Sequence, residues 1–171
     1  IVRKNQELLE SEELNTFDKE QLIAYYRRSQ SDVDLQNALK FLCGCLKQHY
    51  HKDVILLIDE YDVPLQSAYL KGYYDEMADF LSGMFSAALK TNDALEKGIL
   101  TGCLRIAKES IFTGLNNFSV YSISEDQSST SFGFTPKETI TLLEHYDLKS
   151  YEQTIKEWYD GYLFGNKEIY N

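Results

Sequence analysis

Residues Val54–Glu60 read VILLIDE, a run of five apolar residues that ends in two acids. The run is too short for a buried helix and is rich in β-branched residues. It therefore predicts a strand that is buried on both faces, as in a parallel sheet. In open sheets of this kind, ligands bind beyond the carboxyl ends of the strands. We therefore expect Asp59 and Glu60 to face a ligand, with the dry strand behind them.

The segments around this strand alternate between helical and strand patterns. Helical patterns occupy residues 6–28, 31–50, 73–90 and 149–160, and Pro136 suits the first turn of a further helix. Second and third strands are expected at 99–104 and 118–123. This order predicts an α/β fold with a parallel sheet covered by helices. We expect an α/β core over residues 1–127 and a helical C-terminal extension of the same domain over residues 128–171.

Composition narrows the classes of function. The chain has 171 residues, enough for one domain with a real core. Its 27 acidic and 17 basic residues give a net charge of −10, which disfavours direct binding of nucleic acid. It contains no apolar run of membrane-spanning length. The odd number of cysteines, three, indicates a reducing compartment, so we expect a cytoplasmic protein. The chain starts at Ile1 and not at a methionine, so we expect a fragment of a longer protein.

An apolar strand followed by Asp-Glu is the Walker B pattern of nucleotide hydrolases. Asp59 would hold Mg²⁺, usually through water, and Mg²⁺ would neutralise the charge that develops on the phosphates. Glu60 would act as the general base for the attacking water, and Asp62 adds a carboxylate nearby. The alternative is that the acids only cap the following segment.

The loop that grips phosphates in such enzymes is absent from the chain. The pattern Gly-x-x-x-x-Gly-Lys-[Ser/Thr] does not occur, and no glycine is followed by lysine. Without the backbone amides and the lysine of that loop, clustered carboxylates would face a triphosphate unaided. We therefore expect no tight ATP binding by this chain alone.

Four motifs extend the pattern well beyond one strand. They read VILLIDEYDVPL (54–65), ILTGCLRIAKESIFTGLNN (99–117), GFT (133–135) and KEWYDGYLFG (156–165). In this order they resemble the AAA-ATPase-like family of bacterial proteins, over about residues 35–171. The resemblance implies a truncated P-loop NTPase core (AAA/STAND-like) with a helical C-terminal part. Members often carry a PD-(D/E)XK nuclease-like domain after the ATPase part, and their phosphate loop lies upstream of the residues present here.

The resemblance assigns roles to individual positions. Asp59 matches the Mg²⁺-coordinating acid and Glu60 the catalytic acid. Thr101 and Arg105 fall where this class places a polar sensor of the γ-phosphate, although Arg105 could equally form a surface salt bridge.

Further signature positions have no role that follows from their chemistry. They are Asn116, Asn117 and the run Trp158–Gly161. We expect Trp158 and Tyr159 to pack in the core and Gly161 to end the last helix in a left-handed conformation.

The leading hypothesis is hydrolysis of ATP with Mg²⁺ in the full-length protein, with this fragment alone inactive. The alternative is a non-hydrolysing scaffold that mediates protein interaction or regulates an attached nuclease domain. A Mg²⁺-dependent nuclease built on Asp59, Glu60 and Asp62 is weaker, because no lysine follows at short spacing in a second strand. Removal of part of the sheet would also expose apolar surface and favour self-association.

A zinc site is a further alternative. Cys45 and His49 share one face of a helix, with Cys43 and His51 nearby. Two further ligands at motif spacing are missing, and a free cysteine commonly packs as a small core residue. The core interpretation is favoured.

Overall fold

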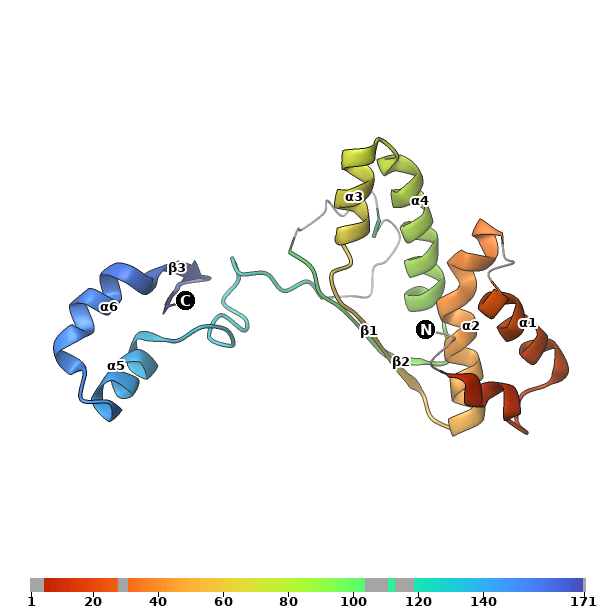
Figure 1. Ribbon diagram of the computed structural model, residues 1–171, viewed down its shortest axis with the longest axis horizontal. Helices are drawn as coiled ribbons and strands as arrows, with labels where there is room; N and C mark the ends of the chain where they lie inside the picture. The colour runs from red at the N-terminus through yellow and green to blue at the C-terminus, as the bar shows by residue number, and fades with distance from the viewer. Residues whose placement is uncertain (1–4, 28–30, 104–110, 113–118, 171) are drawn as a thin grey trace. The chain divides into compact units, whose positions relative to one another are not determined.

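The computed structural model describes residues 5–27, 31–103, 111–112 and 119–170. The chain divides into two compact units, residues 1–117 and residues 118–171, and each is described by itself (Figure 1). The division falls at 117/118, whereas the sequence suggested 127/128.

The N-terminal unit mixes helices with parallel strands, so it belongs to the α/β class expected from the sequence. In chain order its elements are the 3₁₀ helix η2 (Gln6–Glu10), α1 (Thr16–Arg27), α2 (Asp32–Tyr50), β1 (Val54–Ile58), α3 (Val63–Lys71), α4 (Tyr74–Phe85), the π-helical turn η3 (Ser86–Lys90) and β2 (Leu95–Leu100). The helix expected over residues 73–90 is α4 continued by η3. Strand β2 begins earlier than expected, at Leu95, and ends at Leu100.

Local sequence signals set the ends of the helices. Helix α2 begins with a capping box, in which the Ser31 hydroxyl accepts from the Asp34 amide and the Asp34 carboxylate accepts from the Ser31 amide. Helix α3 has Pro64 in its first turn and ends at Gly72, whose φ is 78°. The first cap sets the start of α2, and the glycine separates α3 from α4.

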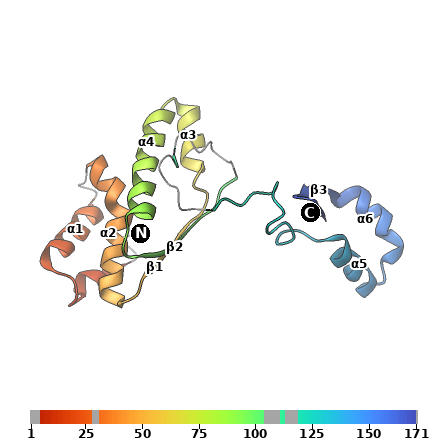
Figure 2. The same cartoon turned by 180° about the vertical axis from the view of Figure 1, so that it is seen from behind.

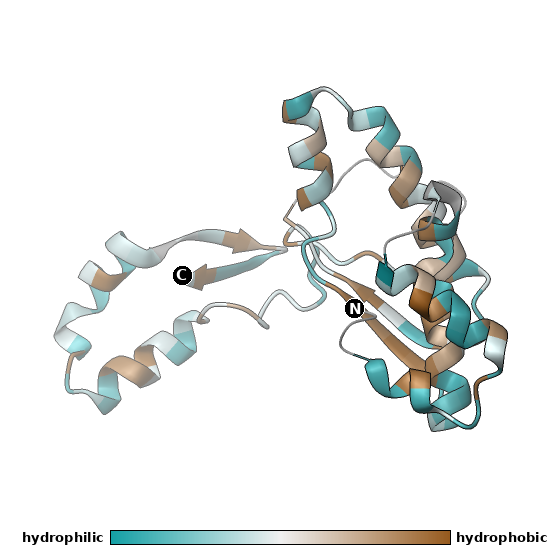
Figure 3. Ribbon diagram, turned by 45° about the vertical axis from the view of Figure 1, so that its right-hand side comes forward, coloured by the Kyte–Doolittle hydropathy of each residue, from teal (hydrophilic) through white to brown (hydrophobic). Residues whose placement is uncertain are grey.

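Strands β1 and β2 pair in parallel, with Leu57 opposite Ile99 and Ile58 opposite Leu100. Helices α2 and α4 lie on one side of this pair (Figures 1 and 2). The prediction that β1 is buried on both faces is wrong for the described residues. Ile55 is 54% exposed and Leu57 is 69% exposed. Figure 3 shows the strand in brown, the colour of apolar residues, although described helices cover only one of its faces.

Two apolar clusters form the core of the N-terminal unit. The first contains Leu65, Ala78, Leu81, Phe85 and Ile111, and the second contains Leu8, Leu14, Leu22, Leu42 and Cys45. Ile58, Tyr61 and Leu100 pack against the first cluster, so the ends of both strands are anchored to it. Each fully buried Leu or Phe contributes about 1.5–3 kcal/mol of transfer free energy.

The C-terminal unit combines helices with an antiparallel hairpin. Its elements are α5 (Pro136–His145), the 3₁₀ helix η4 (Lys149–Tyr151), α6 (Glu152–Tyr159), β3 (Asp160–Phe164) and β4 (Lys167–Tyr170). Strands β3 and β4 pair antiparallel, and Phe134 adds an isolated bridge to Tyr170. The third strand expected at 118–123 does not form over its described residues, 119–123.

Two expectations for this unit are wrong. Trp158 is 77% exposed and Tyr159 is 50% exposed, so neither is a core residue of the unit. Gly161 does not terminate a helix in the left-handed region. Helix α6 ends at Tyr159, and Gly161 lies inside β3 with a φ of 156°. The chain passes from helix to strand without the turn that such a cap would make.

The longest helix of the N-terminal unit, α2, has 19 residues and a mixed sequence. Among the described residues, no helix is both long enough and apolar enough to cross a membrane.

Candidate functional site

The polar residues after β1 and β2 meet at one edge of the parallel pair. Asp59 and Glu60 follow Ile58 directly, and Thr101 follows Leu100, the register partner of Ile58. All three side chains are exposed. We call Asp59, Glu60 and Thr101 the β1–β2 tip.

One oxygen of Asp59 receives two hydrogen bonds. The Thr101 hydroxyl donates to Asp59 Oδ1. The backbone amide of Glu60 donates to the same oxygen over 3.0 Å. Because a carboxylate oxygen has two lone pairs, these donors occupy Oδ1. Among the described residues, both of these hydrogen bonds to the Asp59 carboxylate end at Oδ1, so Oδ2 is left for a ligand.

Backbone hydrogen bonds continue the pairing of the strands into the tip. The Thr101 amide donates to the Ile58 carbonyl over 2.9 Å, and the Tyr61 amide donates to the Thr101 carbonyl over 3.0 Å. Hydrogen bonds of the Thr101 backbone and hydroxyl therefore connect this residue to the end of β1 and to the residues that follow it. Such anchoring favours one orientation of the Asp59 carboxylate.

Glu60 adopts a backbone conformation that is uncommon for its residue type. Its φ is 53°, in the left-handed region, where residues with a Cβ are disfavoured. Its carbonyl accepts from the Val63 amide over 3.1 Å, which closes a turn into α3. This turn directs the chain from the end of β1 into α3. Nothing in the sequence pattern indicated it.

Asp62 differs from the exposed carboxylate expected near the metal. It is only 1% exposed, and its Oδ2 accepts from Gln66 Nε2 over 2.8 Å. Its carbonyl also accepts from the amides of Leu65 and Gln66, at the start of α3. Asp62 thus belongs to the interior at the helix start, and the three-acid nuclease site is not assembled.

Gly102 was not singled out from the sequence, although a glycine next to a strand end is a signal of close approach. A Cβ at this position would lie 2.7 Å from Asp62 Oδ1 and 2.8 Å from Tyr61 Cε1. Only glycine lets the chain after Thr101 come this close to the residues after β1.

Other predicted positions fall outside the described residues or outside the site. Arg105, Asn116 and Asn117 lie outside the described residues. Cys43 and Cys45 are buried and free, and burial raises the pKa of the Cys45 thiol to about 12, with the nearby Asp18 adding to the rise. A thiol held in its protonated form is a poor metal ligand. His49 Nδ1 instead lies 2.8 Å from the Ser11 hydroxyl.

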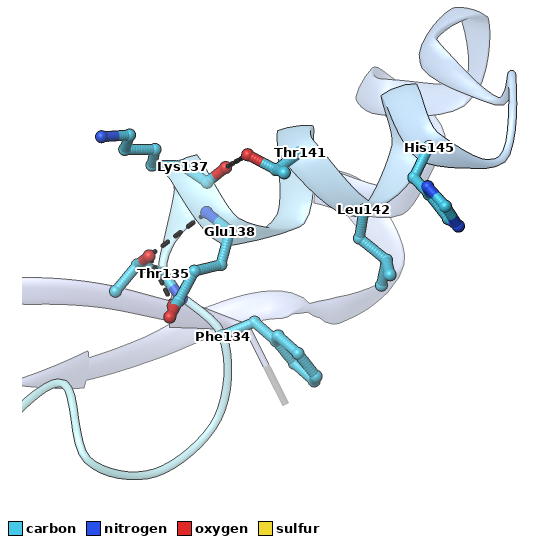
Figure 4. A pocket seen from close by; sticks show the side chains of 7 residues that line it. All are labelled: Phe134, Thr135, Lys137, Glu138, Thr141, Leu142 and His145. Atoms are coloured by element: carbon cyan, nitrogen blue, oxygen red, sulfur yellow. Dashed lines mark hydrogen bonds between the residues drawn. The ribbon is translucent and has the colours of Figure 1, made fainter.

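Two open cavities are lined by residues other than those of the tip. One, of about 630 Å³, runs along α5 in the C-terminal unit (Figure 4). Phe134 and Leu142 lie on the same side of this helix in the close view. The polar groups here already have structural roles, because Thr135 and Glu138 form a capping box and the Thr141 hydroxyl donates to the Lys137 carbonyl. The other cavity, of about 310 Å³, lies between α1 and α2.

The tip fits a cation that takes only part of its ligands from protein. Among the described residues, no group of three His, Cys, Asp or Glu side chains could enclose a metal. Mg²⁺ is commonly held by one or two carboxylates, waters and the phosphates of a substrate. Asp59 offers one such oxygen, so the donors present suit Mg²⁺ with a phosphate ligand and do not suit zinc.

Comparison with known proteins establishes the family. The sequence model of the family described as "Predicted AAA-ATPase" matches residues 2–112, more than half of the chain. The chain belongs to the AAA-ATPase-like family. The matched range includes the whole β1–β2 tip of this AAA-ATPase-like chain and leaves α5, α6 and the hairpin outside it.

One relative is an uncharacterized protein from the vnfD 5′ region of Azotobacter chroococcum mcd 1. It is 27% identical over 119 residues, which cover 69% of this chain and 23% of the relative. The AAA-ATPase-like chain therefore spans less than a quarter of the length of this relative. No solved structure matches it.

Proposed function

We propose that this chain supplies the Walker B half of an ATP-hydrolysing site, with a P-loop core completed by a phosphate-binding segment that the chain does not itself contain. The single observation that carries the proposal is the meeting of Asp59, Glu60 and Thr101 beyond the carboxyl ends of two parallel strands. Ligands of open α/β sheets bind at that edge. The family description agrees with ATP as the nucleotide.

Each residue of the tip has a distinct proposed task. Asp59 offers an oxygen to Mg²⁺, and Thr101 and the Glu60 amide hold that carboxylate in place. When bound, Mg²⁺ offsets the charge on the phosphates. The exposed Glu60 carboxylate accepts a proton from the attacking water. Arg105, suggested by the resemblance as a second sensor beside Thr101, stays a proposal without structural support.

The test uses the complete protein with its phosphate-binding loop. Glu60→Gln removes the proton acceptor and keeps the size of the side chain, so turnover should fall by about 10²–10⁴-fold while ATP binding is retained. Glu96→Gln, at an exposed position on β2, is the matched control and should leave turnover unchanged. Unchanged hydrolysis in Glu60→Gln would refute the proposal.

The chain of residues 1–171 should by itself show no ATPase activity and no specific ATP binding by calorimetry. Its net charge of −10 repels a triphosphate, and it has no Gly-Lys loop to offset that charge. Tight binding would show that another part of the chain grips phosphate.

A second candidate is a scaffold without hydrolysis that binds a protein partner or regulates an attached nuclease. The uncovered sheet face favours it, since Ile55, Leu57 and Ile99 are exposed there. Hydrolysis that depends on Glu60 would exclude this candidate, whereas a complete protein without turnover would favour it.

A further inference from the structure

We propose that Asp62 is a positioning residue, whose buried carboxylate holds the turn between β1 and α3 and thereby sets where the Glu60 carboxylate lies. The inference rests on the proposed function, because it takes Glu60 as the proton acceptor. It gives Asp62 a task that differs both from binding a metal and from capping a helix.

The Asp62 side chain does not have the usual role of an acid at the start of a helix. An aspartate there ordinarily accepts a hydrogen bond from one of the first amides of the helix. Asp62 directly precedes α3, and among the described residues its side chain makes no such bond. The residue is instead only 1% exposed, and its Oδ2 accepts from Gln66 Nε2. Because burial of a carboxylate costs free energy, an apolar residue would serve stability alone as well.

The backbone on either side of Glu60 determines the direction of its side chain. On one side, the Glu60 amide donates to Asp59 Oδ1, just after β1. On the other side, the Glu60 carbonyl accepts from the Val63 amide over 3.1 Å. Glu60 itself has a φ of 53°, a conformation that persists where the surrounding structure maintains it. The position of the Glu60 carboxylate therefore depends on what holds residues 61–63.

Asp62 connects this turn to the elements beside it. Towards α3, its carbonyl accepts from the amides of Leu65 and Gln66, and its carboxylate accepts from the Gln66 side chain. Towards β2, its Oδ1 lies 2.7 Å from the position that a Cβ of Gly102 would occupy. The absence of a side chain at Gly102 thus makes room for the buried carboxylate. Asp62 is enclosed between the start of α3 and the chain that follows β2.

Loss of this carboxylate would release the turn without removing a group that contacts ATP. Asp62 is buried, so a bound nucleotide meets the exposed Glu60 and not Asp62. Proton transfer requires the acceptor to lie within hydrogen-bond reach of the attacking water. A displacement of about 1 Å can lower a rate by about 10²-fold. We therefore expect the chemical step to slow, whereas the affinity for ATP should not change.

The test measures kcat and KM for ATP in the complete protein with its phosphate-binding loop. Asp62→Ala should lower kcat by about 10²-fold and leave KM within about twofold of the wild type. Asp62→Asn keeps the shape and an oxygen that can accept from Gln66, so it should retain kcat within about threefold. Leu81→Ala, in the same unit but on α4, controls for lost packing and should leave the kcat of the folded protein unchanged.

A double variant separates positioning from a general loss of structure. If Asp62 acts through Glu60, Asp62→Ala lowers kcat no further in the Glu60→Gln protein, because the proton acceptor is already gone. Losses that multiply in the double variant would overturn the inference. It would also be overturned by a wild-type kcat in Asp62→Ala, or by an Asp62→Asn protein as slow as Asp62→Ala.

Gln66→Met takes the place of Asp62→Ala if the alanine variant does not fold. It changes an exposed position of α3 and removes the donor to Asp62, so kcat should fall by about three- to tenfold at an unchanged KM. A wild-type kcat in that variant would overturn the inference. The proposed function would still stand, because it fails only if Glu60→Gln hydrolyses ATP at the wild-type rate.

Discussion

At the scale of single residues, Glu60 adopts a backbone conformation that a glutamate disfavours. Its left-handed conformation costs about 1–2 kcal/mol for a residue with a Cβ. The amide of the same residue donates to Asp59 Oδ1. Uncommon backbone conformations of this kind gather at functional sites, where the surrounding structure maintains them. The proposed function, which needs a carboxylate at this position, would account for the absence of glycine.

Replacement of Glu60 should reveal this cost. Glu60→Gly should be more stable than Glu60→Ala by about 1 kcal/mol, since both lose the carboxylate and only alanine keeps the Cβ. Urea unfolding of the two variants measures the difference. Equal stabilities would mean that the left-handed turn adds no strain.

A second prediction at the residue scale compares the replacement of two glycines by alanine. Gly102→Ala should destabilise the N-terminal unit by about 1–3 kcal/mol, because the new Cβ would overlap the buried Asp62 and the Tyr61 ring. Gly44→Ala is the control within the same unit. It lies in α2 with open space around its Cβ position, and alanine should stabilise the helix by about 1 kcal/mol. Thermal unfolding that shifts both variants in the same direction would contradict the packing described at Gly102.

At the scale of elements, the helix ends follow from local sequence. Helix α5 begins at Pro136 after Thr135, whose hydroxyl accepts from the Glu138 amide. The Glu138 carboxylate in turn accepts from the Thr135 hydroxyl over 2.7 Å and the Thr135 amide over 2.8 Å. These hydrogen bonds, the one from the hydroxyl foremost, lower the pKa of Glu138 below its usual 4.5.

The capping box of α5 should therefore depend on pH. Because the folded pKa lies below the unfolded value of 4.5, the stabilisation is complete above pH 4.5 and is lost as pH falls through the folded pKa. Glu138→Gln can keep the hydrogen bonds but does not titrate, so it is the matched control. The Thr135 amide shift, followed by NMR from pH 6 to pH 2, should move in the wild type alone. A similar movement in the glutamine variant would assign the change to other acids.

At the scale of the whole chain, the uncovered face of the parallel pair is the main consequence. Parallel sheets are normally covered on both faces. Here Leu57 of β1 and Ile99 of β2 are register partners, and both side chains are exposed. Exposed apolar residues and unpaired strand edges favour association with another chain.

We therefore expect the chain to self-associate through this face. Ile55→Thr together with Leu57→Thr keeps strand propensity and lowers apolar exposure, so it should shift the chain toward monomer. Leu70→Gln, at an 85% exposed position on α3, is the control and should leave association unchanged. Sedimentation velocity over a concentration series measures the effect. A monomeric wild-type chain would contradict this expectation.

Thiol labelling tests the burial of α2. The pKa of Cys45 is raised to about 12 by burial and by Asp18, so at pH 8 roughly one thiol in 10⁴ is ionised. Cys43 is also buried, while Cys103 is exposed. The native chain should label rapidly at Cys103, and the unfolded chain at its three cysteines. Rapid labelling of Cys45 in the native chain would show that α1 and α2 separate readily.

Sequence alone determined what depends on near neighbours along the chain. The apolar run of β1 ending at Asp59, the caps at Ser31 and Thr135 and the apolar stripe of α4 are each set by residues within a few positions. The α/β class and the family follow from the order of these patterns. These features could be predicted because helix and strand periods and capping are local.

Tertiary structure decided what depends on residues distant in sequence. The bond from Thr101 to Asp59, the burial of Asp62 and the exposure of Leu57 each require strands and helices to be placed against one another. Periodicity cannot distinguish a strand covered on both faces from one covered on a single face, because cover comes from other elements. The place of Asp59 and Glu60 directly after β1 was therefore readable from sequence. The oxygen that remains available on Asp59 was fixed only when β2 brought Thr101 to it.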